Sequence, residues 1–177
     1  MNLVRLLLVP CLWTVVLPVQ ASGTLFTYDQ FTAGLNIRSV EAHDQSRMWS
    51  TCAAVHELVA VMDDNGADSP SAKESANQGS GAKVASAIVF IVDYFEGTDA
   101  PDPAIFASKW QMATMVMESN YETVTTSIFS DMAADPAAFS EKLLPTYRYC
   151  LNILDVQQEY IDLWRELYGS GLLAPQS

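Results

Sequence analysis

Apolar residues recur at three- and four-residue spacing along most of the chain, which is the pattern of amphipathic helices. The clearest stretch runs from Ser39 to Asp63. Its apolar stripe consists of Met48, Cys52, Val55, Val59 and Met62. No stretch of useful length alternates between apolar and polar residues as a half-buried strand does, so the chain is predicted to be all-α.

Three further helices are expected, because the same start signal occurs three times. Ser69-Pro70, Asp102-Pro103 and Asp135-Pro136 each place a capping side chain before a proline, which suits the first turn of a helix. Gly79 and Gly81 weaken the second helix, which either runs from Pro70 to Glu96 or begins near Ala82. The four predicted helices span residues 39–63, 70–96, 103–133 and 136–168.

Four long helices with short connections predict an antiparallel four-helix bundle over residues 39–168. Pro145 lies inside the fourth helix and is expected to kink or split it, because its ring collides with the preceding turn. Residues 22–38 are predicted to form a strap that packs against the bundle. Residues 169–177 are predicted to be a flexible tail after Gly169 and Gly171.

The first 21 residues have the pattern of a secretory signal peptide. Arg5 precedes an apolar run over residues 6–17, and Val19-Gln20-Ala21 provides a small-residue cleavage site. The run is shorter than the roughly 20 apolar residues that a membrane-spanning helix needs. The protein is therefore expected to be exported, to a bacterial periplasm or the medium, and to have no membrane association after cleavage.

Cleavage would remove Cys11 and leave Cys52 and Cys150, which are predicted to form a disulfide between the first and last helices. Such a bond closes a loop of about 98 residues, worth ~4 to 5 kcal/mol in the chain-entropy model. A buried free pair and a redox-active pair are the alternatives, and the lack of a C-x-x-C spacing disfavours the second.

The chain is strongly acidic, with a formal net charge of −12 at pH 7. Loss of Arg5 would make the charge of the mature chain −13. Such a surface repels nucleic acid and anionic membranes, and no basic cluster offsets it. Charge alone leaves open whether a basic partner binds.

Met112 and Met115 are candidate ligands for a monovalent copper ion, because thioethers suit that soft metal. His43 and Met48 are further candidates for such a site, whereas Met117 turns away from the shared helix face. Core packing is the favoured interpretation of these methionines. His56 lies four residues after Cys52, a spacing that can hold a metal, but a disulfide at Cys52 would remove that option.

Asn120 and Tyr121 interrupt the apolar stripe of the third helix, and Gln157 and Gln158 interrupt that of the fourth at a comparable depth. Facing inward, these four residues would form a buried polar layer or a wet pocket, because buried amides need partners. Exposure to solvent is the favoured alternative.

No nucleophile–base pair, acid–base pair or cofactor motif can be assembled, so an enzyme is the least favoured class and no cofactor is predicted. The chain is expected to be an exported, acidic helical-bundle protein with a non-catalytic binding role, whose partner is a protein or a small ligand. The alternative is a periplasmic carrier of a copper-type metal or a cofactor.

Overall fold

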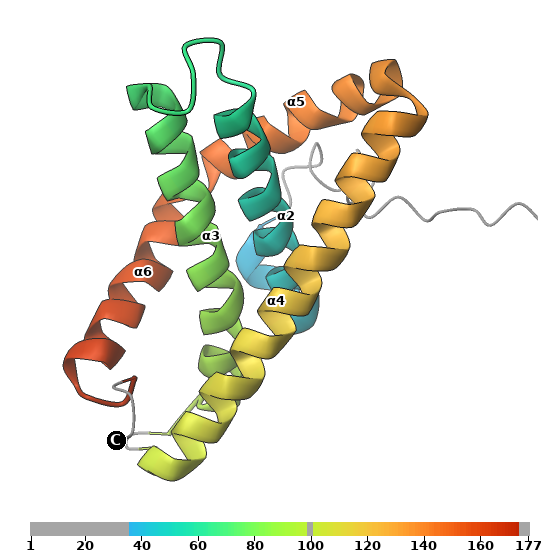
Figure 1. The fold of residues 1–177 in the computed structure, drawn as a ribbon. Helices are drawn as coiled ribbons and strands as arrows, with labels where there is room; N and C mark the ends of the chain where they lie inside the picture. Colours follow the sequence, from blue (N-terminus) through green and yellow to red (C-terminus); the bar gives the residue numbers. More distant parts are fainter. Residues whose placement is uncertain (1–35, 99–100, 174–177) are drawn as a thin grey trace, which may run out of the picture.

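The computed structural model describes residues 36–98 and 101–173, and all regular structure within these residues is helical. A short 3-10 helix and five α-helices follow one another along the chain (Figure 1). Their bounds are η1 Ile37–Ser39, α2 Ala42–Val61, α3 Pro70–Tyr94, α4 Pro103–Ala134, α5 Pro136–Asn152 and α6 Leu154–Gly169. The predicted all-α class is confirmed.

The three cap-and-proline signals begin helices where the sequence places them. Ser69 Oγ accepts the backbone N–H of Ala72 at the start of α3. Asp102 and Asp135 each accept two backbone N–H groups at the starts of α4 and α5. Asp135 also donates its own backbone N–H to the carbonyl of Asp131. One residue therefore ends α4 and starts α5.

Helices α2 and α3 form a closely packed antiparallel hairpin. α3 runs without interruption through Gly79 and Gly81, which settles the choice that the sequence left open. A Cβ atom on Gly79 would lie 3.1 Å from the backbone oxygen of Ala53 in α2, and one on Gly81 only 2.3 Å from Gln157 Nε2 in α6. The glycines weaken the helix in isolation but let two neighbours approach it closely.

The last predicted helix is divided in two, and the division lies at Ile153 rather than at Pro145. Pro145 is accommodated inside α5. Ile153 has φ −111° and ψ 16°, outside the helical range, and is itself buried against the core around Trp49. The break therefore lies at a residue whose apolar side chain is buried in the core, and α6 continues from it in a different direction.

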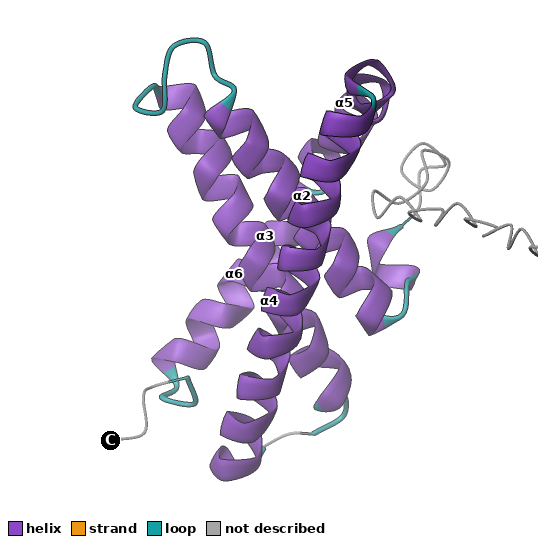
Figure 2. Ribbon diagram, turned by 45° about the vertical axis from the view of Figure 1, so that its right-hand side comes forward, coloured by secondary structure: helices purple, strands orange, loops and turns teal. Residues whose placement is uncertain are grey.

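The arrangement differs from a regular antiparallel bundle. α4 crosses the α2–α3 pair obliquely, and α5 continues from its far end (Figures 1 and 2). α6 packs along α3. The four-helix arrangement is thus not confirmed, whereas the all-helical class and the disulfide are.

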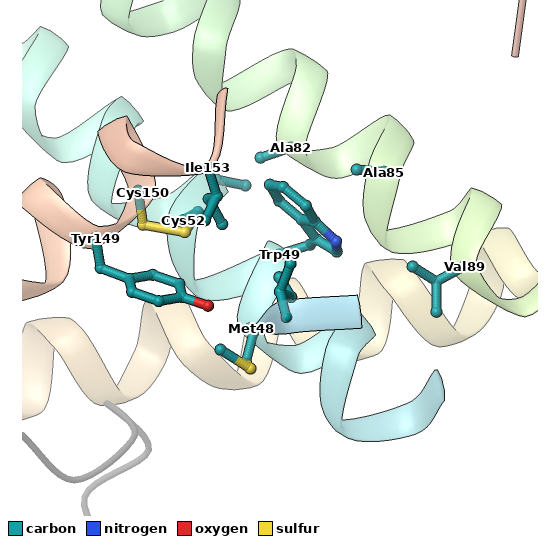
Figure 3. Packing of buried hydrophobic residues seen from close by; sticks show 11 residues of the cluster. Met48, Trp49, Cys52, Ala82, Ala85, Val89, Tyr149, Cys150 and Ile153 are labelled. Atoms are coloured by element: carbon teal, nitrogen blue, oxygen red, sulfur yellow. A yellow bond between two sulfur atoms is a disulfide. The ribbon is translucent and has the colours of Figure 1, made fainter. Parts of the chain in front are cut away.

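Cys52 and Cys150 form the predicted disulfide, with Cα atoms 5.4 Å apart. Both cysteines are buried, and Figure 3 shows the bond beside Trp49 and Tyr149 in the cluster that joins α2, α3 and α5. Because Cys150 lies at the end of α5, the bond ties α2 to that helix. The cross-link is part of the main hydrophobic core.

The ends of the chain fall mostly outside the described residues. The predicted signal peptide (1–21) and most of the predicted strap (22–35) are among the residues not described, as are 174–177. The described part of the strap ends in η1, where Ile37 is buried in the core. Leu172 and Leu173 pack against the cluster around Phe106, so this part of the predicted flexible tail is packed.

Candidate functional site

A surface hollow of about 500 Å³ lies between the start of α2 and the middle of α4. It is called the methionine hollow below, and its lining brings together three of the predicted metal ligands, His43, Met112 and Met115. The remaining lining residues are Ser108, Gln111, Val116, Ser119 and Asn120. Residues almost 70 positions apart in the chain therefore share one site.

Met112 and Met115 reach the surface together because they are three residues apart on one face of α4. Their relative exposures are 49% and 62%. Met117 instead packs on the cluster around Phe106, as expected from its position on the helix. The favoured interpretation of these methionines as core residues is therefore wrong for Met112 and Met115.

His43 lies in the first turn of α2 and is exposed. Its ring centroid is 6.4 Å from that of Phe90 in α3, with the two planes tilted by 53°. This contact supports one side of the imidazole while the hollow lies beside it. The site therefore combines two thioethers on flexible side chains with a histidine on a separate, well-packed helix.

A buried hydroxyl cluster lies behind the hollow. Ser86 Oγ lies 2.8 Å from Ser46 Oγ and 3.0 Å from Ser50 Oγ, and it donates to the backbone carbonyl of Ser46. All three serines are fully buried. Asn120 lines the hollow and donates from Nδ2 to Ser46 Oγ at 3.2 Å, so it joins the open site to the buried cluster.

Sequence reasoning missed these serines. Ser46 and Ser50 are four residues apart and so share a helix face, which was an available signal. Their partner Ser86 lies on α3 and only the packing of the hairpin identifies it. The cluster satisfies the hydroxyls internally and therefore fixes the register of α2 against α3.

His56 lies apart from the methionine hollow. It is fully buried, neither ring nitrogen has a hydrogen-bond partner, and its ring meets Tyr147 edge-on at 5.4 Å. Burial lowers the pKa of His56 to about 4. Because Cys52 is in the disulfide, the Cys52–His56 metal pair does not exist, and the four predicted metal ligands do not form one set.

The predicted polar layer is divided among separate places. Asn120 joins the serine cluster, and Gln157 is buried and donates to the backbone carbonyl of Gln78 at 3.1 Å. Gln158 is exposed and bonds to Asp162. The fourth residue, Tyr121, is half-buried and donates its hydroxyl to Glu57. Asn120 and Tyr121 therefore serve the interface between α2 and α4, Gln157 serves the interface between α3 and α6, and Gln158 lies on an exposed face.

Tyr121 belongs to a charged group between α2, α3 and α4. Lys83 Nζ lies 2.7 Å from Glu57 Oε1 and 3.8 Å above the ring of Tyr121. Burial lowers the pKa of Lys83, but the bond to Glu57 and its charge outweigh burial and raise it. Burial and the bond to Glu57 both raise the pKa of Tyr121. Lys83 therefore stays charged near neutral pH, and its ion pair with Glu57 links α3 to α2 beside Tyr121.

No three His, Cys, Asp or Glu side chains among the described residues come together as a metal site, so any metal at the methionine hollow would depend on thioether sulfur. None of the helices in residues 36–98 and 101–173 has both the length and the apolar character needed to cross a membrane.

Comparison of the chain with protein-family models, with curated proteins and with solved structures found no match.

Proposed function

We propose that this protein is an exported, non-catalytic binding protein that carries a monovalent copper ion in the methionine hollow. The observation that carries the proposal is the exposure of Met112 and Met115 in the same hollow as His43. Both side chains lie outside the buried core clusters and are about half exposed or more, which weakens core packing as the reason for their presence. In this proposal the scaffold is an irregular bundle of four long helical segments. These are α2, α3, α4 and the consecutive pair α5 and α6.

The donor chemistry favours copper in its monovalent state. Two thioethers and one imidazole form a soft, neutral ligand set, which suits Cu(I) better than Zn²⁺ or Mg²⁺. Methionine side chains have three rotatable bonds, so both sulfurs can turn toward one ion. His43 on α2 would provide the third ligand and fix the position of the ion against the fold.

Export fits this role and rests on separate support. The disulfide between Cys52 and Cys150 requires an oxidising compartment in most organisms. Thioether ligands, unlike thiolates, keep binding soft metals under such conditions because they do not form disulfides. Mass spectrometry of the protein from the periplasmic fraction would test export, and we expect a mature chain that begins at Ser22 with its two cysteines oxidised.

The metal proposal predicts tight binding of one Cu(I) ion per chain. The measurement is an anaerobic titration of the full mature protein against a chromophoric Cu(I) chelator. Met112→Leu and Met115→Leu should each weaken binding at least about tenfold, and the double variant should abolish competition with the chelator. His43→Gln should weaken binding without changing the helix content.

Met62→Leu is the matched control. Met62 is 58% exposed but follows the last residue of α2, at the opposite end of a helix roughly 30 Å long. Its replacement should leave Cu(I) affinity unchanged. Affinity that is equally reduced by Met62→Leu, or unchanged in the Met112/Met115 double variant, would show that the copper is bound elsewhere and overturn the proposal.

A further inference from the structure

A second and larger concavity lies on the side of α3 that faces α6. It has a volume of about 890 Å³, and the segment 38–45 closes one side of it. It is called the α3/α6 groove below, and it shares no lining residue with the methionine hollow. Its apolar lining includes Val89, Val92, Phe95, Phe106, Leu163 and Leu167.

Acidic side chains line the groove from both helices. Asp93 lies in the last turn of α3 and Glu96 just after that helix, whereas Glu159 and Glu166 come from α6. Among the described residues that line the groove, Arg38 is the one cation, and it is paired with Glu159. Three carboxylates therefore remain available to a bound group.

The dipoles of α3 and α6 add to the negative potential of these carboxylates. Gly81 is next to Gln157, and further along Ile91 and Leu167 pack in one cluster, so α3 and α6 run parallel. Figure 1 shows both helices ending at the same end of the molecule. The C-terminal ends of α-helices carry partial negative charge, and here two of them end beside the same groove.

We propose that the α3/α6 groove binds a small amphiphilic cation. The apolar body of the ligand lies on Val89, Leu163 and Leu167, and its ammonium group lies toward Glu96 and Glu166. Phe95 and Phe106 stack with ring centroids 5.4 Å apart and line the groove. Phe106 is buried, so half-buried Phe95 is the ring that can contact the cation. The volume is within the range of small-molecule sites, about 300–1,000 Å³.

The test is a two-dimensional NMR titration of the metal-free, full mature protein with three eight-carbon amphiphiles. Octyltrimethylammonium should shift the signals of Val89, Leu163 and Leu167 saturably. Octyl sulfate, with the same chain and the opposite charge, should bind at least about tenfold more weakly, and added salt should narrow that difference. Octyl glucoside, which is uncharged, should bind with an affinity between those of the other two.

Charge-neutralising variants test the assignment of the acidic residues. The double variant Glu96→Gln/Glu166→Gln should weaken binding of the cation about fivefold or more while leaving octyl glucoside binding unchanged. The matched control is Glu122→Gln/Glu141→Gln, which removes the same charge from exposed positions outside the groove lining. Val92→Trp, at a 42%-exposed position of the lining, should block all three amphiphiles in a protein whose circular dichroism is unchanged.

Three outcomes would overturn the proposal. Equal affinity for the cation and the sulfate would show that the groove is a general apolar surface without preference for charge. Equal weakening by the control pair would show that the effect of the Glu96/Glu166 variant comes from net charge alone. A dimer in solution that Val92→Trp dissociates would make a second copy of the chain the occupant.

Discussion

At the scale of single residues, His56 is the clearest departure from ordinary core chemistry. A fully buried imidazole usually hydrogen-bonds at one nitrogen at least, but both nitrogens of His56 lack a partner. The cost of burying the charged ring lowers its pKa to about 4. Near neutral pH the fold therefore holds this histidine uncharged.

The fold is expected to lose stability in mild acid for this reason. In the unfolded chain a histidine has a pKa of about 6.5, so the unfolded state takes up a proton before the folded state does. Stability falls as the pH drops from about 6.5 to 4, by a total of roughly 3 kcal/mol. His56→Leu removes this proton uptake and the two unpartnered nitrogens, so the variant should be as stable as wild type at pH 7 and more stable at pH 4.5.

The measurement is the free energy of unfolding in urea at several pH values between 7 and 4. Carboxylates that titrate in this range affect both proteins, so the difference between wild type and variant isolates His56. His43→Leu is the control, since it replaces an exposed histidine. Parallel pH curves for wild type and His56→Leu would contradict the assignment.

The candidate site shows what residue patterns predict and what they leave open. Helical spacing placed Met112 and Met115 on one face and turned Met117 away from it. Whether that face was covered depended on how α4 crosses α2, which no local pattern encodes. Since oblique packing leaves this part of α4 uncovered, the pair favoured as core is exposed.

At the scale of helices, Gly81 shows why α3 tolerates a residue that weakens it. A methyl group there would collide with Gln157 Nε2 at 2.3 Å and Ile161 Cδ1 at 2.9 Å. Gln157 cannot move freely, because it is buried and its amide donates to the backbone carbonyl of Gln78. The glycine is therefore required by the contact between α3 and α6.

Gly81→Ala should destabilise the protein by about 1–3 kcal/mol through overpacking, despite the better helix propensity of alanine. Gly169→Ala is the matched control, because a Cβ atom there meets nothing within 4 Å. That variant should be neutral or stabilising by up to about 1 kcal/mol. Thermal unfolding followed by circular dichroism measures both, and a stabilised Gly81→Ala would contradict the close approach of the two helices.

Helix starts were predictable and the last helix break was not. Ser69, Asp102 and Asp135 act through hydrogen bonds to residues two or three positions ahead, so neighbouring sequence is enough to identify them. The break after Asn152 exists because Ile153 is buried against distant parts of the chain. Pro145 is the stronger local signal for a helix break, yet in the folded protein it lies within α5.

At the scale of the whole molecule, one covalent bond joins parts that packing alone joins weakly. α5 has limited contact with α2, and α6 packs mainly on α3, so α5 and α6 would otherwise be held by separate small interfaces. The disulfide crosses from α2 to α5 inside the largest core cluster. It therefore couples the α2–α3 hairpin to the segment from which α6 departs.

Opening this bond should remove much of the stability of the fold. The cysteines are 98 residues apart in the sequence, and the chain-entropy model gives ~4 to 5 kcal/mol for such a loop, against a typical total of roughly 5–15 kcal/mol. Urea unfolding of the oxidised and the reduced protein measures the difference. The slope of the free energy against urea should increase on reduction, because the unfolded chain then exposes more surface.

Cys52→Ala/Cys150→Ala separates the cross-link from its packing. Reduction keeps both sulfur atoms in the core, whereas the double variant also leaves a void beside Trp49, so the variant should be less stable than the reduced protein by about 1–2 kcal/mol. A reduced protein with the urea midpoint of the oxidised one would mean that packing alone holds α5 in place. The expected loss would instead show that the cross-link, and not packing alone, couples α5 to the α2–α3 hairpin.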